Sequence, residues 1–374
     1  MKKNTSTPSS TPLHYVVWRA LPGGAESYVT QYAEQFGAAR DIYVYSLRAS
    51  ENRISEAPQV HFTAGSDNNW ACYRDFFLYC RQHKDHFFHL MSTGPITLLL
   101  ALLAGVRHPV YHIHGTKYWK SAKEKIYLKA AWRLASRFQV TYIANSRYSA
   151  GIFQIEVLPL APKVIYNGFD TENFLARRYR RTSLRRMAYV GRLHTGKNVD
   201  LVLRLFAGIA ESFPELELHI AGDGMLRETL EAQAQQTPFG HRIVFHGWVE
   251  DVASFYQNID LFLFLSAYES FGNVVLEALL AGVPVLTSNI PVFEEIHGGE
   301  EAFLLGDPGD FEAMQVRFEQ AVAHFPALAE KAYHFADQAG DAFSMSTHLA
   351  EIESLYRQKG LASGSPGPFN ETNV

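Results

Sequence analysis

Two glutamates flank the start of a predicted helix in SAYESFGNVVLEALLAGVPV, residues 266–285. Glu269 stands just before this helix, and Ser270 is a residue type that commonly caps a helix N-terminus. Glu277 lies further along, and because helical side chains lean toward the N-terminus, its carboxylate is expected to point back toward the helix start. The backbone N–H groups of the first turn are suited to an anion, and that turn would comprise Phe271, Gly272 and Asn273.

This arrangement could hold the phosphates and the sugar of a nucleotide. Gly272 has no Cβ, so a ligand can approach the backbone closely. The Glu277 carboxylate can accept hydrogen bonds from a vicinal diol such as that of ribose. The apolar run 260–265 just upstream is typical of a buried strand in a parallel sheet, and ligands bind outside the carboxyl ends of such strands. The alternative is an amphipathic helix with two solvated glutamates.

The segment AYVGRLHTGKN supplies two cations where another predicted strand ends. Arg192 and Lys197 lie on either side of Gly196, in a loop that leads into a helix near Asn198. Two cations beside a helix N-terminus form a suitable clamp for a diphosphate. The alternative is a pair of exposed surface cations.

Two glycine pairs follow predicted strands and carry weaker signals. Gly222 and Gly224 frame a strand-to-helix turn in the second half of the chain, and Gly23 and Gly24 follow the first strand. Glycine permits both a tight turn and the close approach of a phosphate. Each pair is therefore interpreted either as a binding loop or as a structural turn.

His112 and His114 lie at the end of the predicted strand 109–114. Because strand side chains alternate, both histidines share one face, and a metal pair must be weighed. No third ligand is evident nearby in the sequence. We therefore favour a single polar contact from His114 to a substrate, and we interpret His112 as a structural histidine.

Composition narrows the class of protein. The 374 residues suffice for two domains, and 47% hydrophobic with 19% charged residues is typical of a soluble globular protein. The net charge of -4 argues against nucleic-acid binding. No secretory signal is visible, and the longest apolar run, 96–106, is too short to span a bilayer.

Cys72 and Cys80 share the predicted helix 68–83. Their separation along it is about 12 Å, which is too far for a disulfide. We therefore expect a reducing, cytoplasmic setting.

Apolar runs alternate with helical patterns along most of the chain, which is the signature of α/β doubly wound parallel sheets. The strands expected in the first half are 13–18, 41–46, 59–62, 86–91, 109–114, 139–144 and 163–166. Those expected in the second half are 186–192, 216–221, 243–246, 260–265, 283–287 and 302–305.

Apolar periodicity stops at the arginine-rich stretch ARRYRRTSLRR, which we interpret as a solvated linker between two Rossmann-like domains. Contact of these arginines with an anionic lipid or a substrate is the alternative. A cleft between two such domains would be the default ligand site. The expected division is a disordered N-terminus 1–12, an N-terminal domain 13–176, a linker 177–186, a C-terminal domain 187–344, a C-terminal helix 345–360 and a disordered tail 361–374.

Taken together, these segments resemble the retaining glycosyltransferases of the GT-B fold, specifically glycosyltransferase family 4. In the first half the resemblance rests on GGAESYV, the HG that ends strand 109–114, IANSRYSAG and VIYNGFDTENF. In the second half it rests on YVGRLHTGKN, IAGDGMLRETL, FHGWVEDV and the specific Glu-x7-Glu segment 266–285. It covers most of the chain, 13–358, and implies two Rossmann-like domains facing across a cleft, with the C-terminal crossover helix returning to the N-terminal domain.

The resemblance implies a role for each position. Arg192 and Lys197 would hold the donor diphosphate, and Glu277 the ribose hydroxyls. Glu269 would lie beside the transferred sugar, which His114 would contact from the first domain. Glu269, His114, Arg192 and Lys197 are thus the expected catalytic residues. Further donor contacts, mainly through backbone groups, would come from Gly23, Gly24, Gly224, Val249, Phe271, Gly272 and Asn273.

This chain departs from the family pattern at two places. Leu265 stands where family members often carry proline before the serine of the Glu-x7-Glu segment, which affects only the local bend. Asn289, Ile290 and Pro291 stand where small glycines are more usual, and this change would reshape the sugar pocket.

The implied reaction moves a hexose from a nucleoside-diphosphate sugar, UDP- or GDP-linked, to the hydroxyl of a glycan, lipid-linked or small-molecule acceptor in bacterial envelope glycan, lipopolysaccharide or exopolysaccharide synthesis. No cofactor and no essential metal are expected, because the chain has no Asp-x-Asp pair and cations with helix dipoles can stabilise the leaving diphosphate. The alternatives are a same-fold sugar phosphorylase or nucleotide-sugar epimerase, or a non-catalytic nucleotide-sugar-binding protein.

The segment 117–137, KYWKSAKEKIYLKAAWRLASR, combines basic residues with an apolar stripe at helical spacing. It is interpreted either as a core-facing helix with a solvated basic face or as a peripheral attachment to an anionic membrane, at the inner face of the plasma membrane. The basic residues are Lys117, Lys120, Lys123, Lys125, Lys129, Arg133 and Arg137, and the stripe is Trp119, Ile126, Ala130, Leu134 and Phe138.

Overall fold

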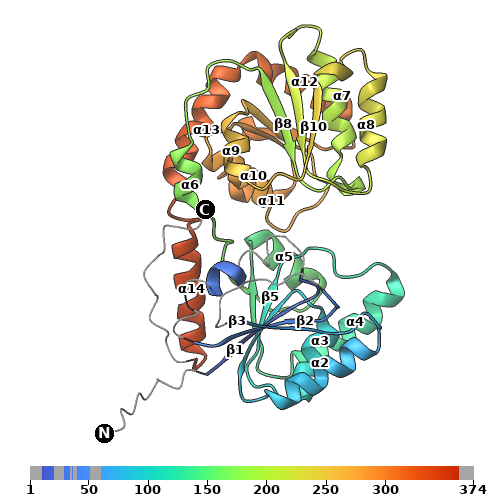
Figure 1. Cartoon of the computed structure of the whole chain (residues 1–374), viewed down its shortest axis with the longest axis vertical. Coiled ribbons are helices and arrows are strands. Elements are labelled where there is room, and N and C mark those ends of the chain that lie inside the picture. Colours follow the sequence, from blue (N-terminus) through green and yellow to red (C-terminus); the bar gives the residue numbers. More distant parts are fainter. Residues whose placement is uncertain (1–10, 21–28, 34–35, 37–39, 51–59, 362–374) are drawn as a thin grey trace. The chain divides into compact units, whose positions relative to one another are not determined.

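The computed structural model describes residues 11–20, 29–33, 36, 40–50 and 60–361. The chain divides into two compact units (Figure 1). The first unit comprises Met1–Tyr166 and His348–Val374, and the second comprises Asn167–Thr347.

The first unit is built on a parallel seven-stranded sheet with the order β3-β2-β1-β4-β5-β6-β7. The reversal of strand order between β1 and β4 is the topological switch point of a doubly wound sheet. All residues of β1, β4 and β5 are buried, as expected for strands covered on both faces. The strands are β1 (Leu13–Val17), β2 (Ile42–Ser46), β3 (Val60–Ala64), β4 (Phe87–Met91), β5 (Val110–Ile113), β6 (Thr141–Ala144) and β7 (Lys163–Val164).

Helices cover both faces of this first sheet. Alternation along β1 directs His14 toward α2, where it contacts Tyr79, and directs Tyr15 toward α14, where it contacts Tyr356. Figure 1 shows α14, in red, beside this sheet. The helices are α2 (Ala71–Gln82), α3 (Pro95–Leu103), α4 (Ala122–Ala135), α5 (Arg147–Glu156) and α14 (Met345–Gln358).

Serine side chains cap the N-termini of α4 and α5 and so explain where these two helices begin. Ser121 accepts a hydrogen bond from the Glu124 backbone N–H and thereby caps α4. Ser146 and Ser149 form a reciprocal capping box at the start of α5. Buried side chains from α2, α3, α4 and α5 then pack with the strands into one core cluster.

The second unit is built on a parallel six-stranded sheet with the order β10-β9-β8-β11-β12-β13. Its switch point lies between β8 and β11, which corresponds to the one between β1 and β4 in the first sheet. The strands are β8 (Arg186–Val190), β9 (Glu217–Ala221), β10 (Ile243–Gly247), β11 (Leu261–Phe264), β12 (Val285–Ser288) and β13 (Leu304–Gly306). The helices are α6 (Thr171–Ala176), α7 (Val199–Ile209), α8 (Arg227–Gln236), α9 (Val252–Gln257), α10 (Asn273–Leu280), α11 (Pro291–Ile296), α12 (Phe311–Ala323) and α13 (Phe325–Ala339).

The structure confirms the predicted α/β class and each of the thirteen predicted strands, with ends shifted by a few residues. Cys72 and Cys80 are buried free thiols on α2. Among the described residues, none of the helices combines the length and the apolarity that crossing a bilayer requires.

The arginine-rich stretch 177–186 differs from the predicted solvated linker. The division between the units falls at Tyr166 and Asn167 instead. Arg181 is only 4% exposed, and its guanidinium donates hydrogen bonds to the carbonyls of Tyr256, Ile259 and Gly282. Five donors in a fixed fork allow one arginine to satisfy several buried carbonyls, so this stretch belongs to the second unit.

The apolar stripe predicted on the segment 117–137 does not form the core face of α4. The buried face consists instead of Ala131, Trp132 and Ala135. Ile126 is 73% exposed, and Leu134 and Phe138 are 41% and 42% exposed. The interpretation of a core-facing stripe is therefore wrong, and α4 presents apolar side chains among its lysines.

Candidate active site

In the second unit, the loops that follow β8 and β11 lie side by side because these strands are neighbours at the switch point. The loop 191–198 binds the loop 265–269 through its backbone: the Ala267 N–H donates to the Gly196 carbonyl at 2.9 Å. The Asn198 amide donates to the Leu265 carbonyl at 2.8 Å. These bonds fix the positions of Lys197 and Glu269, which sequence alone placed 72 residues apart.

Lys197 and Glu269 form an ion pair in which the ammonium donates to the carboxylate. Their side chains are 21% and 16% exposed, and the Lys197 Nζ lies 5.4 Å from the centre of the Phe264 ring. Partial burial reduces solvent screening and strengthens such a pair. Arg192, the other predicted cation of the clamp, is exposed on the same loop.

The start of α10 differs from the prediction. The N-cap residue is Gly272, and no side chain caps the helix, so the predicted cap by Ser270 is wrong. Gly272 has φ +91°, and a Cβ there would lie 2.7 Å from the Phe293 ring. Glycine is therefore required by both the backbone and its packing.

The side chains around this helix start also have structural partners. Phe271 is buried, and its ring stacks on Phe169 with centroids 6.1 Å apart. Asn273 accepts a hydrogen bond from the Asn167 amide at 2.9 Å. The Phe271 and Asn273 side chains therefore serve packing and hydrogen bonding within the second unit, and ligand contact through the backbone of this turn stays a prediction.

Glu277 lies on α10, one turn past the helix start. Its side chain is half-buried, and burial raises the pKa of its carboxyl to about 7. The carboxyl is close enough to Tyr256 to help raise the pKa of that phenol. At neutral pH the Glu277 carboxyl is thus near its titration midpoint, which is a common property of functional carboxyls.

The other predicted contacts of the second unit lie on the same edge of the sheet. A Cβ at Gly222 would lie 1.9 Å from the Gly191 carbonyl oxygen, and one at Gly224 would lie 2.4 Å from that of Leu193. These glycines are therefore explained by close backbone packing at the turn. Val249 is partly exposed, two residues beyond the end of β10.

In the first unit, His114 follows β5, and its backbone N–H donates to the Ser92 hydroxyl at 2.6 Å. Burial lowers the pKa of His114 to about 3, so its imidazole is neutral. Its Nε2 is buried and has no hydrogen-bond partner among the described residues. Such a nitrogen is suited to a ligand hydroxyl. Gly23 and Gly24 lie outside the described residues.

His112 belongs to a buried polar network that the sequence interpretation missed. His89 Nε2 and His112 Nδ1 lie 3.3 Å apart, and the rings of His112 and His114 lie 3.9 Å apart. His89 also bonds the hydroxyl of Tyr356 on α14. Members of this network are separated by up to 267 residues, so no local spacing could reveal it. The network thus holds the ring of His112 against the ring of His114.

A shallow pocket lies where β1, β2 and β3 end in the first unit. Its lining includes Trp18, with the Arg48 guanidinium 5.2 Å from the ring centre. Arg19 donates to the Asp67 carboxylate at 2.8 Å, and Arg48 donates to the Asn69 amide oxygen at 2.6 Å. An exposed tryptophan beside charged and amide groups is suited to a polar ligand that has an apolar face, such as a sugar ring.

Comparison with known proteins identifies each half of the chain. The family model "Glycosyl transferases group 1" matches residues 171–334, and the model "Glycosyltransferase Family 4" matches residues 22–173. Together the two matches run from residue 22 to residue 334.

Curated relatives are similar over part of their length. A mannosylfructose-phosphate synthase from Agrobacterium fabrum is 32% identical over 184 residues, 46% of this chain and 37% of that protein. The capsular polysaccharide glycosyltransferase CapM from Staphylococcus aureus is 26% identical over 46% of this chain and 45% of its own length. An Escherichia coli α-1,3-galactosyltransferase that uses UDP-Gal is 27% identical over 54% of this chain and 57% of its own length. The chain thus aligns with less than two thirds of each of these relatives.

Solved structures show the same fold over nearly the whole chain. HepE from Anabaena, in complex with UDP-glucose, is 20% identical with a TM-score of 0.76, covering 93% of this chain and 100% of that one. WaaG, a glycosyltransferase of lipopolysaccharide biosynthesis, is 18% identical with a TM-score of 0.69. The match covers 91% of this chain and 99% of the WaaG chain. The fold is therefore the two-domain GT-B arrangement of Rossmann-like units.

Proposed function

Because the chain belongs to the GT-B glycosyltransferases described by these two family models, we propose that it transfers a hexose from a UDP- or GDP-linked sugar to an acceptor hydroxyl with retention of the anomeric configuration. The observation that carries this proposal is the Lys197–Glu269 ion pair at the switch point of the second sheet. Both residues belong to the motifs that indicated a donor site, and the two loops bring them into contact.

Lys197 and Arg192 bind the donor diphosphate in this proposal. As the bond between sugar and phosphate breaks, negative charge accumulates on the leaving phosphate, and preorganised cations stabilise it. The phosphate competes with Glu269 for the Lys197 ammonium, so donor binding loosens the ion pair. Glu269 is then available beside the transferred sugar.

Glu277 binds the ribose diol through its carboxylate. The half-buried position of this carboxyl excludes part of the solvent that would compete for the diol. The ionised form leaves both oxygens free to accept the two hydroxyl protons, whereas the protonated form uses one oxygen as a donor. Donor affinity should therefore depend on the titration of Glu277, whose pKa is about 7.

Retention is explained by attack on the same face from which the diphosphate leaves. The leaving phosphate takes the proton of the acceptor hydroxyl, and Lys197 and Arg192 balance its charge throughout. No divalent metal takes part in this scheme, because the two cations supply the positive charge. The HepE structures, which contain UDP or UDP-glucose, support a nucleotide-sugar donor for this fold.

The acceptor is proposed to be a saccharide unit of a bacterial surface polysaccharide, whose sugar ring packs on Trp18. Relatives that act in capsule synthesis and as a galactosyltransferase support this class of acceptor. The pocket at Trp18, Arg48 and Asp67 offers an aromatic face and both signs of charge. The enzyme works in the cytoplasm, where nucleotide sugars are made, and α4 brings it to a membrane-linked acceptor.

The decisive experiment incubates the purified protein with a panel of UDP- and GDP-linked sugars and saccharide acceptors. Transfer should release nucleoside diphosphate only when an acceptor is present, and NMR of the product should show the anomeric configuration of the donor. Glu269→Gln should bind the donor at least as tightly as the wild type, because the charged carboxylate no longer competes for Lys197, and should lose transfer. An altered sugar formed without any acceptor would instead indicate an epimerase, and binding without turnover would indicate a non-catalytic protein.

A further inference from the structure

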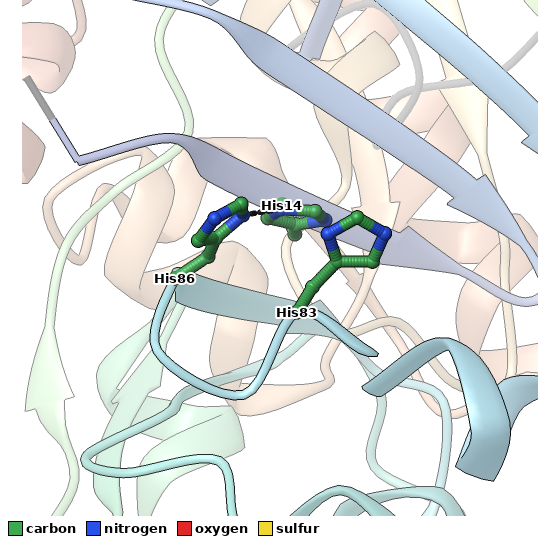
Figure 2. A group of neighbouring side chains, drawn as sticks. All are labelled: His14, His83 and His86. Carbon is green, nitrogen blue, oxygen red and sulfur yellow. Dashed lines mark hydrogen bonds between the residues drawn. The ribbon is translucent and has the colours of Figure 1, made fainter. Parts of the chain in front are cut away.

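Three histidines of the first unit lie together at the amino-terminal edge of its sheet, whereas the candidate site residues lie at the carboxyl ends of the strands. His14 is the second residue of β1, and His83 and His86 lie in the turn between α2 and β4. Figure 2 shows the rings of His83 and His86 on either side of His14. One nitrogen from each ring lies within 4.8 Å of the others. The proposed transfer reaction makes no use of this cluster.

The His14 ring is held rigidly. It stacks between Tyr43 of β2 and Phe88 of β4, with centroids 4.6 and 4.7 Å away and interplanar angles of 9° and 14°. Its Nδ1 lies 2.7 Å from the Tyr79 hydroxyl, which leaves Nε2 directed toward His86. A hydrogen bond to the second ring nitrogen is the usual way in which a protein orients a histidine ligand of a metal.

The turn that carries the other two rings is also fixed. The His83 backbone N–H donates to the Tyr79 carbonyl at 3.1 Å, which ends α2, and the His86 N–H donates to the His83 carbonyl at 2.9 Å. Tyr79 thus orders both sides of the cluster, through its hydroxyl and through its carbonyl. Both histidines of the turn are only partly buried, so an ion can reach the cluster from solvent.

We propose that His14, His83 and His86 bind one Zn²⁺ ion, with water as the fourth ligand, and that the ion ties the α2–β4 turn to the start of β1. Three imidazoles are a ligand set that zinc accepts, with Zn–N bonds of about 2.0–2.1 Å. A tetrahedral site with such bonds separates its nitrogens by about 3.3 Å. His14 Nε2 and His86 Nδ1 lie 2.8 Å apart in a hydrogen bond, so binding exchanges this bond for two bonds to the metal.

The neutral state of the three imidazoles suits metal binding. Burial, with His86 and His83 nearby, lowers the pKa of His14 to about 2, and burial also lowers the pKa values of His83 and His86. All three rings are therefore neutral at pH 7, which is the form that binds metal. The proton of His14 can rest on Nδ1, facing the Tyr79 oxygen, so zinc displaces no proton from the cluster. Asp85 lies beside His86 and supplies a negative charge near the ion.

The test titrates the full-length, EDTA-treated protein with Co²⁺ and Zn²⁺. One Co²⁺ per chain should produce the visible absorption of a four-coordinate site, and Zn²⁺ should remove that absorption and raise the thermal midpoint. His83→Ala and His86→Ala should each weaken zinc binding by more than about a hundredfold, since even outer partners contribute 10–100-fold. Tyr79→Phe retains the ring packing and should weaken binding by about 10–100-fold.

His246→Ala is the matched control, because His246 pairs with His219 in the second unit and is exposed there. It should leave the tight site and its Co²⁺ absorption unchanged. Far-UV circular dichroism in EDTA checks that each variant folds, and His86→Gln replaces a variant that does not. Wild-type protein without a stoichiometric zinc site, or a site that persists in both His83→Ala and His86→Ala, would overturn the proposal.

Discussion

At the scale of single residues, the ion pair of Lys197 and Glu269 links the two motifs that the sequence singled out. Each residue was expected to contact a different part of the donor, and the structure shows that they also contact each other. The pair neutralises a partly buried carboxylate, and in the proposed mechanism the donor phosphate replaces this carboxylate as the partner of Lys197. Replacing either residue therefore changes the state of its partner as well as removing a contact.

The clamp is tested by Lys197→Ala and Arg192→Ala. Each change removes a charge-assisted contact to the diphosphate worth roughly 1.5–3 kcal/mol, so the dissociation constant of UDP or GDP should rise about tenfold or more. Lys331→Ala is the control, since Lys331 pairs with Glu300 at the surface of the same unit. Calorimetric titration measures the effect, and unchanged affinity in both clamp variants would show that the loop is not a phosphate site.

We predict that Glu277 makes donor binding dependent on pH. Its carboxyl has a pKa of about 7, so the ionised fraction falls as pH drops below 7. The affinity for UDP-glucose, which itself does not titrate in this range, should fall by up to about tenfold between pH 8 and pH 6. Glu277→Gln should bind more weakly at pH 8 and show a flat profile. A pH-dependent profile that persists in this variant would assign the titration to another group.

The same pKa predicts a trend in stability without ligand. The folded pKa lies above the unfolded value of 4.5, so the unfolded chain ionises first as pH rises. Stability contributed at this site is therefore highest below about pH 4.5, falls between pH 4.5 and 7, and is level above that range. The free energy of unfolding of Glu277→Gln, measured by denaturation at each pH, should not show the decline that Glu277 causes between pH 4.5 and 7.

At the scale of elements, α4 has a buried face made of small residues and one tryptophan, and an outer face that mixes lysines with exposed apolar side chains. The periodicity of its apolar residues was readable from the sequence, but the face that the unit buries was not. Ala131 and Ala135 permit close helix packing, and Trp132 fills the core, so the larger stripe at Ile126 and Leu134 remains at the surface.

This face predicts binding to an anionic membrane. Co-sedimentation should recover the protein with vesicles that contain anionic lipid and not with neutral vesicles, and recovery should fall as salt rises. Changing Lys120, Lys123 and Lys129 to Glu should abolish binding, since each basic residue near the surface contributes about 1 kcal/mol. Lys331→Glu in the second unit is the control. Equal recovery in the supernatant with both vesicle types would favour a soluble acceptor.

At the scale of the whole molecule, the chain forms two sheets whose first six strands follow the same order, and then returns to the first. The last helix, α14, buries Glu353 against groups from the start of the chain. The Glu353 carboxylate accepts hydrogen bonds from the Tyr32 hydroxyl and from the Arg40 guanidinium, which is fully buried. The first unit is thus completed by residues more than 300 positions away.

The buried ion pair of Glu353 with Arg40 predicts that Glu353→Ala destabilises the protein. Removing one partner of a buried ion pair leaves the Arg40 charge uncompensated, which costs about 3–5 kcal/mol. Glu351→Ala, an exposed position on the same helix, should have little effect. Urea denaturation followed by circular dichroism compares the two variants. Equal stability of both would show that α14 contributes little to the first unit.

The sequence by itself determined the elements and the motifs of this protein. Short apolar runs bounded by turn residues predicted the strands, and each of the thirteen predicted strands is a strand in the structure, whereas the longest apolar run, 96–106, forms most of helix α3. The residues expected to bind a donor were also readable, because Gly272, Glu269 and Glu277 are close in sequence, although the cap of that helix was not read correctly. Local spacing suffices wherever the relevant atoms belong to one loop and the helix that follows it.

Only the tertiary structure decided the features that join distant segments. The cap of α10 is Gly272 because Phe293 packs against it, and Arg181 is buried because four carbonyls from later segments surround it. The cluster of His14, His83 and His86 was missed for the same reason, although the His-x-x-His spacing of 83–86 was visible. Its third member comes from a strand that is adjacent in the sheet and some seventy residues away in sequence. Parallel sheets pair strands through long crossovers, so which side chains meet at the ends of these strands is set by the order of the strands.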